Sequence, residues 1–173
     1  FLPLSASQSF SILMLQSNLP PADLPAPWQH LDVGDTGLPG NAGYDAGTFT
    51  NTGAGLDIYN NYDAFHYIYR PVTGDVQIVA RVVSLQPTDP WAKAGVMIRR
   101  TIDDFSGHVF MTLTPSSGVN YQHRQDDYGS SDNIAGAAVT APYWVKLIRT
   151  GTSFSGYSSS NGADWTLVGS SSN

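Results

Sequence analysis

All the acidic residues of this chain are aspartate, and this restricts the secondary structure that the chain can form. Its 173 residues include fourteen acidic side chains, no glutamate, and only two lysines, Lys93 and Lys146. Glutamate and lysine are strong helix formers, whereas aspartate, asparagine, serine and glycine favour turns and helix caps. The composition therefore disfavours helices, and no stretch of the sequence shows a sustained helical period.

Short apolar runs separated by turn residues follow Trp28, which is the pattern of an all-β chain. Residues 76–83 and 141–149 carry apolar side chains on both parities, as central strands covered on both faces do. About ten strands at this spacing predict a β-sandwich or jelly roll. The predicted strands are 28–33, 48–52, 56–60, 64–70, 75–85, 94–100, 108–114, 119–125, 143–149, 153–158 and 165–168.

The longest polar stretch, residues 126–140, is interpreted as a loop. It would be either a lid over one face of the sandwich or the end of a long hairpin. The chain has no cysteine, so core packing must supply the stability that disulfides would otherwise give.

A further apolar strand, residues 9–16, lies apart from the others. The proline-rich stretch 18–27 separates it from the rest, so we divide the chain into an N-terminal extension, residues 1–23, and a β-sandwich domain, residues 24–173. An extended segment places alternate residues on opposite faces, and this one would present apolar side chains on both. Those on one parity are Phe10, Ile12 and Met14, and those on the other are Leu13 and Leu15.

Several short motifs point to one family. The block from Trp91 to Arg99, Trp-Ala-Lys-Ala-Gly-Val-Met-Ile-Arg, is the most specific, and the segments 28–34, 141–147 and 159–169 accompany it. Together they resemble a concanavalin A-like β-sandwich module that recurs in secreted bacterial multidomain proteins, often beside glycoside hydrolases. The resemblance covers about residues 24–169. It implies a jelly-roll fold and an accessory role, with carbohydrate binding as the usual presumption.

In that family further strands follow the late hairpin, whereas this sequence stops at Asn173. The resemblance therefore implies an empty strand position, which would leave core and unpaired backbone groups uncovered. We expect the N-terminal strand to fill it through Phe10, Ile12, Leu13, Met14 and Leu15. It would either close its own sandwich or enter a neighbouring molecule, which would propagate into a filament. The sequence leaves both routes open.

The sequence offers no arrangement typical of catalysis. Glucanase relatives of this fold use paired glutamates on one strand, and this chain has none. The adjacent pairs at 103–104 and 126–127 lie in predicted loops, where neighbouring side chains point apart. No pair of the four histidines has the spacing of zinc ligands. The sequence also has no Gly-x-Ser-x-Gly motif, which would mark a serine nucleophile. We therefore expect no enzymatic activity and no catalytic residues.

Two kinds of ligand remain as hypotheses. Asp32, Asp35 and Asp45 flank a Gly/Asn-rich loop, and their hard oxygens suit a structural calcium ion. No other cofactor is expected.

The second hypothesis is carbohydrate binding. Aromatic faces stack on the apolar side of sugar rings while planar polar groups bind the hydroxyls. The candidate carbohydrate-binding residues are Tyr62, Tyr67, Trp91, Tyr121 and Arg124.

Charge and composition limit the kinds of molecule that this protein is expected to bind. The net charge of −6 argues against nucleic acid and anionic membranes, and no run reaches membrane-spanning length. A Ser/Gly-rich, weakly charged chain that begins at Phe1 looks like a mature secreted product. The predicted function is a non-catalytic extracellular or cell-surface structural or adhesive module, in its sharpest form a self-associating filament subunit that donates its N-terminal strand. The alternative is a carbohydrate-binding module of a secreted glycoside hydrolase system.

Overall fold

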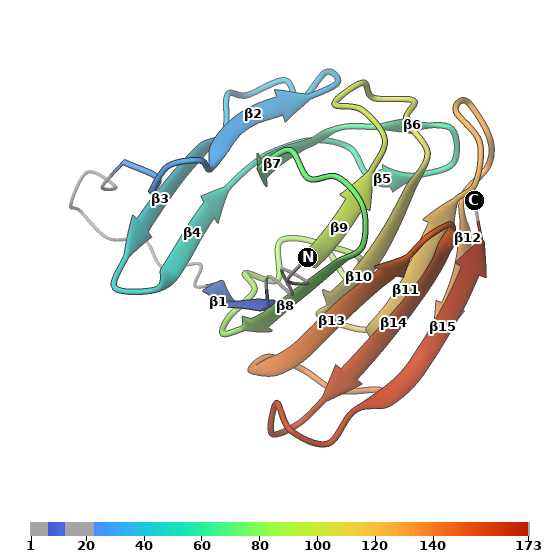
Figure 1. The fold of residues 1–173 in the computed structure, drawn as a ribbon. Helices are drawn as coiled ribbons and strands as arrows, with labels where there is room; N and C mark the ends of the chain where they lie inside the picture. The colour runs from blue at the N-terminus through green and yellow to red at the C-terminus, as the bar shows by residue number, and fades with distance from the viewer. Residues whose placement is uncertain (1–6, 13–22, 173) are drawn as a thin grey trace, which may run out of the picture.

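The computed structural model describes residues 7–12 and 23–172, and the prediction of an all-β chain is confirmed for them. Two sheets face each other in a sandwich-like arrangement (Figure 1). The larger sheet consists, in spatial order, of β15 (Thr166–Ser172), β14 (Ser153–Ser159), β13 (Tyr143–Thr150), β8 (Val76–Val82), β1 (Ser7–Ile12), β4 (Thr48–Thr52) and β3 (Asn41–Asp45). The smaller sheet consists of β12 (Asp132–Ala135), β11 (Gly118–Arg124), β10 (His108–Thr114) and β9 (Ala94–Arg99).

Two short strand pairs complete the described fold. In one, β2 (Gln29–Val33) pairs with β7 (Phe65–Tyr69), and in the other, β5 (Ile58–Tyr59) pairs with β6 (Tyr62–Asp63). No helix long and apolar enough to cross a membrane occurs in the part of the chain that the structure describes.

The main core lies between the two sheets. On β10, every second residue, Val109, Met111 and Leu113, is buried against this core. The larger sheet contributes Ala80 and Val82 from β8 and further residues from β13 and β14. Both β8 and β13 pair with a strand on each side, so the prediction that they are central strands is confirmed.

The opposite face of the smaller sheet is also covered. Met97 and Phe110 pack with Ile58 of the β5–β6 hairpin, and the partly buried Phe65 and Tyr67 of β7 lie against them. All seven residues of β10 are therefore buried, on both faces of the strand. This second covered face also encloses buried polar side chains, among them Asp63, His108 and Arg124.

The N-terminal strand joins the larger sheet. β1 lies between β8 and β4 and runs parallel to both, which makes this part of the sheet mixed. Its register places Phe10 opposite Ala80 and Ile12 opposite Val82. Ala80 and Val82 are buried. The strand begins two residues before the predicted start at residue 9. The predicted positions Leu13, Met14 and Leu15 lie outside the described residues.

Several segments differ from the sequence-based prediction, among them β6, which lies between the predicted strands 56–60 and 64–70. The strand β3 was not predicted, because Asn41 and Gly43 are poor strand formers; it forms because Ala46 (φ 44°) and Gly47 (φ 90°) make a tight hairpin turn into β4. The predicted loop 126–140 contains the strand β12, which pairs with β11 and therefore belongs to the sheet.

Candidate functional site

A fully buried arginine lies at the end of β11. The Arg124 side chain donates to both carboxylate oxygens of Asp63, with Nη2–Oδ1 at 2.6 Å and Nη1–Oδ2 at 3.1 Å. Its Nε also donates to the carbonyl of Asn60 at 3.0 Å, and its Nη1 to the carbonyl of Ser106 at 3.1 Å. One guanidinium thus joins the smaller sheet to the β5–β6 hairpin and to the segment 100–107.

Basic side chains surround the Asp63 carboxylate. Arg99, His108 and Arg124 occupy neighbouring register positions on β9, β10 and β11. Arg99 Nη1 lies 3.2 Å and His108 Nδ1 lies 3.7 Å from Asp63 Oδ2, and all these side chains are at most 2% exposed. Burial raises the pKa of Asp63 above its ordinary value, while hydrogen bonds and charges of the two arginines limit that rise.

His108 is a neutral imidazole in this cluster. Burial, assisted by the positive charges of Arg124 and Arg99, lowers the pKa of His108 to about 3. Its Nε2 has no hydrogen-bond partner within the described ranges. A proton on this ring would add a further charge to a site that already holds two arginines and one carboxylate.

Three loop segments meet above the Arg124–Asp63 pair. The amide of Tyr128 donates to the carbonyl of Phe105 at 2.9 Å, and the amide of Gly107 donates to Asp127 Oδ1 at 2.7 Å. Ser131 Oγ donates to the carbonyl of Asn60 at 2.9 Å. The segments 57–63, 100–107 and 125–131 are therefore fixed to one another as well as to the sheet.

These segments carry a group of aromatic side chains, Tyr62, Phe105 and Tyr128, which we call the aromatic surface. Tyr128 lies flat on Phe105, with ring centroids 4.0 Å apart and planes at 10°. The Tyr62 ring packs edge-on against the Tyr128 ring, with centroids 6.1 Å apart. Tyr62 and Tyr128 are 54% and 56% exposed, although each touches another ring. The predicted sites included Tyr62 but missed Phe105 and Tyr128, because only tertiary contacts bring these loops together.

The structure separates the other predicted sugar-binding residues. Tyr121 and Arg124 are both 0% exposed and cannot contact a polysaccharide, so these two predictions are wrong. The Tyr121 hydroxyl is hydrogen-bonded to Ser171 Oγ at 2.8 Å, and burial raises its pKa. Tyr67 is partly buried, its hydroxyl donates to the carbonyl of Met97 at 3.4 Å, and burial raises its pKa to about 12. Trp91 is 51% exposed, but it lies in a different loop, beside Lys93.

Two of the three predicted calcium ligands, Asp32 and Asp35, have other contacts. Asp32 accepts hydrogen bonds from His66 Nδ1 at 2.6 Å and from the amide of Gly40 at 3.1 Å, and these lower its pKa. Asp35 accepts from the amide of Gly37, and Asp45 ends β3 with an exposed side chain. Among the described residues, no three His, Cys, Asp or Glu side chains form a group that could hold a metal ion.

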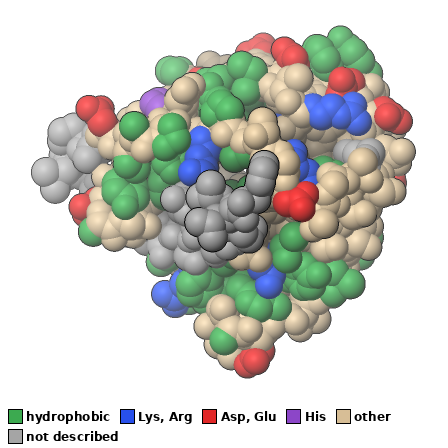
Figure 2. All heavy atoms as spheres, in the orientation of Figure 1, with side chains coloured by type: hydrophobic (Ala, Val, Ile, Leu, Met, Phe, Trp, Pro, Cys, Tyr) green, Lys and Arg blue, Asp and Glu red, His purple; other side chains and the backbone are tan. Residues whose placement is uncertain are grey.

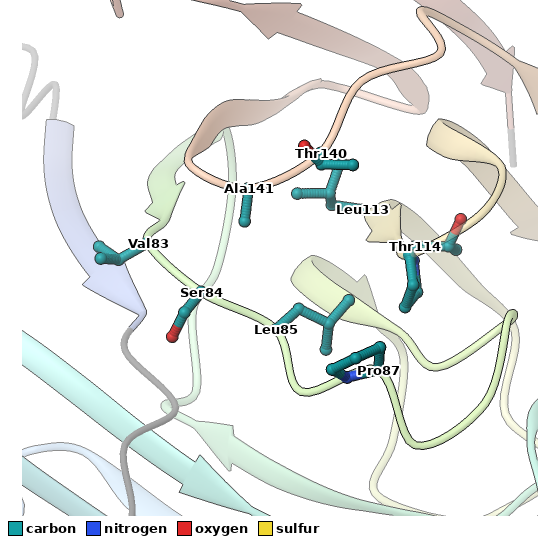
Figure 3. A pocket seen from close by; sticks show the side chains of 9 residues that line it. Val83, Ser84, Leu85, Pro87, Leu113, Thr114, Thr140 and Ala141 are labelled. Atoms are coloured by element: carbon teal, nitrogen blue, oxygen red, sulfur yellow. The ribbon is translucent and has the colours of Figure 1, made fainter.

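A pocket of about 320 Å³ lies at one end of the sandwich, between the segment after β8, the end of β10 and the segment before β13 (Figure 3). Its size is at the lower end of small-molecule sites. The lining has hydroxyl groups but no charged or aromatic side chain, so it offers little to orient a polar ligand. The lining residues are Val83, Ser84, Leu85, Pro87, Leu113, Thr114, Pro115, Thr140 and Ala141.

Charge does not single out a site on the face drawn in Figure 2, where acidic side chains are scattered over the edge and near the middle. No family model, no curated protein and no solved structure matches this chain. The aromatic surface is the strongest candidate, because exposed rings are combined there with a fixed backbone.

Replacing Arg124 by methionine should lower the free energy of unfolding by about 3–5 kcal/mol, because Asp63 would be left as a buried charge with less compensation. The matched control is Arg100→Met. Arg100 and Asp127 form an exposed ion pair at 3.3 Å, for which about 0–1 kcal/mol is expected. Urea denaturation of the three proteins measures both values. Equal effects of the two substitutions would contradict the role given to Arg124.

His108 should make the protein sensitive to acid. The unfolded chain takes up a proton near pH 6.5, whereas the folded chain does so only near pH 3, so stability falls as pH drops below about 6.5. Between pH 6.5 and 4.5 this residue should remove about 2–3 kcal/mol. The measurement is urea denaturation across this range for the wild type and His108→Gln. The variant should show the shallower dependence, and parallel curves would refute the assignment.

Proposed function

We propose that this chain is a non-catalytic extracellular adhesive module that binds polysaccharide through the aromatic surface of Tyr62, Phe105 and Tyr128. The observation that carries the proposal is the stacking of Tyr128 on Phe105 while more than half of Tyr128 stays exposed. An exposed ring supported from below offers a flat apolar platform, which matches the C–H face of a pyranose ring.

The rigidity of the platform supports the same proposal. Binding costs free energy when loops and side chains must be ordered, and that cost falls when they are already fixed. Here the Arg124–Asp63 pair and the hydrogen bonds of Tyr128, Gly107 and Ser131 hold the three segments before any ligand arrives. Exposed polar side chains on the same segments, among them Asn60 and Asp126, are available to bind sugar hydroxyls.

A non-catalytic role fits the position of the carboxylates. Glycoside hydrolysis needs two carboxyl groups that flank one scissile bond. Asp63, the carboxylate beneath the aromatic surface, is enclosed and paired with two arginines. Asp127 accepts from the Gly107 amide and pairs with Arg100, so it too has a structural partner.

We also propose that the sandwich is a concanavalin A-like jelly roll with an N-terminal extension. The path of the chain supports this proposal: it leaves the larger sheet after β8, forms β9 to β12 of the smaller sheet, and returns to the larger sheet at β13. The family-like block that begins at Trp91 contributes the whole of β9. Secretion is supported by the Ser/Gly-rich, weakly charged composition.

Polysaccharide binding should depend on the Tyr128 ring. Tyr128→Ala should weaken binding about five- to thirtyfold, the equivalent of about 1–2 kcal/mol for a contact residue of this type. Tyr128→Phe should retain most of it, since the ring remains. The measurement is pull-down with insoluble plant, algal and bacterial polysaccharides, followed by calorimetry with soluble fragments of those that bind.

Trp91→Ala is the control, because Trp91 is equally exposed but lies in another loop. If Trp91→Ala abolishes binding while Tyr128→Ala does not, the site lies elsewhere. If the wild type binds none of the polysaccharides, the proposed function is wrong.

Self-association by exchange of β1 is a second candidate function, and one observation favours it. β1 pairs with β8 over six residues and with β4 over two, and in the sheet it is the strand that joins them. A donated strand from another molecule can make the same pairs, because exchange of an identical element conserves its contacts. Repeated in one direction, such donation would build a filament.

This second candidate predicts that a variant lacking residues 1–20 is monomeric or unstable and binds a synthetic peptide of residues 5–16. The full chain should form oligomers whose size rises with protein concentration, since exchange is bimolecular. Size-exclusion chromatography with light scattering measures both. A full chain that stays monomeric at every concentration, or a stable truncated variant that ignores the peptide, would contradict strand exchange.

A further inference from the structure

A second polar cluster lies on the β2–β7 pair, away from the contacts of the aromatic surface. Asp32 on β2 is directly opposite His66 on β7, and His30 is two residues before Asp32 on the same strand. His66 Nδ1 lies 2.6 Å from Asp32 Oδ1, and its Nε2 lies 2.9 Å from His30 Nδ1. His66 is only 5% exposed, whereas His30 is exposed.

The contacts of Asp32 determine where the protons of this cluster lie. Both oxygens of Asp32 already accept the amide of Gly40, so the carboxylate acts as an acceptor. His66 therefore carries a proton on Nδ1, which it donates to Asp32. In a neutral ring this leaves a lone pair on His66 Nε2, directed at His30. The Nδ1 of His30 then supplies the proton between the two nitrogens.

Two glycines approach His66 closely, Gly40 at its ring and Gly53 at its Cβ and backbone. A Cβ atom added to Gly40 would lie 2.1 Å from His66 Nδ1, and one added to Gly53 would lie 2.6 Å from His66 Cβ. Asn51 Nδ2 also donates to the carbonyl of His66 at 3.1 Å. The lone pair of Nε2 is therefore fixed in direction, while the exposed ring of His30 has room to turn.

We propose that His66 Nε2 and His30 Nδ1 form a two-nitrogen site for a divalent transition-metal ion, with Cu²⁺ bound most tightly. A metal ion bound about 2.0–2.1 Å from His66 Nε2 would lie on the side where His30 Nδ1 now accepts or donates at 2.9 Å, and the exposed His30 ring would have to move aside to bind the same ion. Imidazole nitrogens completed by water suit the tetragonal coordination of Cu²⁺ and Ni²⁺. Water completes the coordination on the exposed side.

Asp32 is the positioning residue of this site. A histidine that binds a metal usually donates its other ring N–H to a carboxylate, which fixes the tautomer and makes the ligand more basic. The Asp32–His66 contact has this form. The metal ion replaces the proton between the two rings, whose centroids are 5.0 Å apart. His30 turns its Nδ1 lone pair to the metal and takes up a proton from solvent on Nε2.

The test is titration of the untagged full chain with Cu²⁺ near neutral pH, followed by calorimetry and electron paramagnetic resonance. One ion per chain with two nitrogen couplings is expected. His30→Ala should weaken binding at least tenfold and leave one nitrogen, and Asp32→Asn should weaken it about 10- to 100-fold with two nitrogens retained. The control His123→Gln should bind as the wild type does.

Circular dichroism establishes that each variant is folded, and replacing the exposed His30 is not expected to disturb the sheet. The proposal is overturned if the wild type binds no Cu²⁺ at a tenfold excess of the ion. It is also overturned if His30→Ala binds with unchanged affinity and an unchanged nitrogen count. Either result would mean that His30 and His66 form a hydrogen bond and not a metal site.

Discussion

The buried ion pair between Arg124 and Asp63 is the interaction on which the organisation of this sandwich depends. Both side chains are fully enclosed, and breaking such a pair costs far more than breaking one at the surface. The pair can only be satisfied when the end of β11, the β5–β6 hairpin and the segment 100–107 are all in place. Segments that are far apart in the sequence are therefore stabilised together.

The Arg124–Asp63 pair explains how loops, which are usually mobile, can hold the aromatic surface in a defined arrangement. Loops ordinarily lose entropy on binding, but these loops are fixed by a charged group below them and by backbone hydrogen bonds between them. Tyr62 and Tyr128 can therefore stay exposed in a defined arrangement. The histidine pair on β2 and β7 is fixed in a similar way on a smaller scale, since Asp32 binds the His66 ring and Gly40 lies close against it.

The sequence was sufficient for the fold class but not for the site. Apolar residues on both parities of β8 and β13 correctly predicted central strands, because continuous apolar runs, unlike alternating ones, are typical of interior strands. Arg124 was misassigned to the surface, since arginine is rarely buried and local sequence does not show that another hairpin covers β11. Phe105 and Tyr128 were missed for a related reason. They belong to separate loops, and only the tertiary contacts described above make them neighbours.

The most direct test of the central claim is nuclear magnetic resonance of the labelled protein, titrated with soluble hexasaccharides of cellulose, xylan and chitin. If the loops joined by Arg124 and Asp63 present a polysaccharide site, at least one of these ligands will shift the amide and ring signals of segments 57–63, 100–107 and 125–131, with Tyr62 and Tyr128 shifted most. Shifts concentrated on other strands, or no shifts with any of the three, would contradict the account.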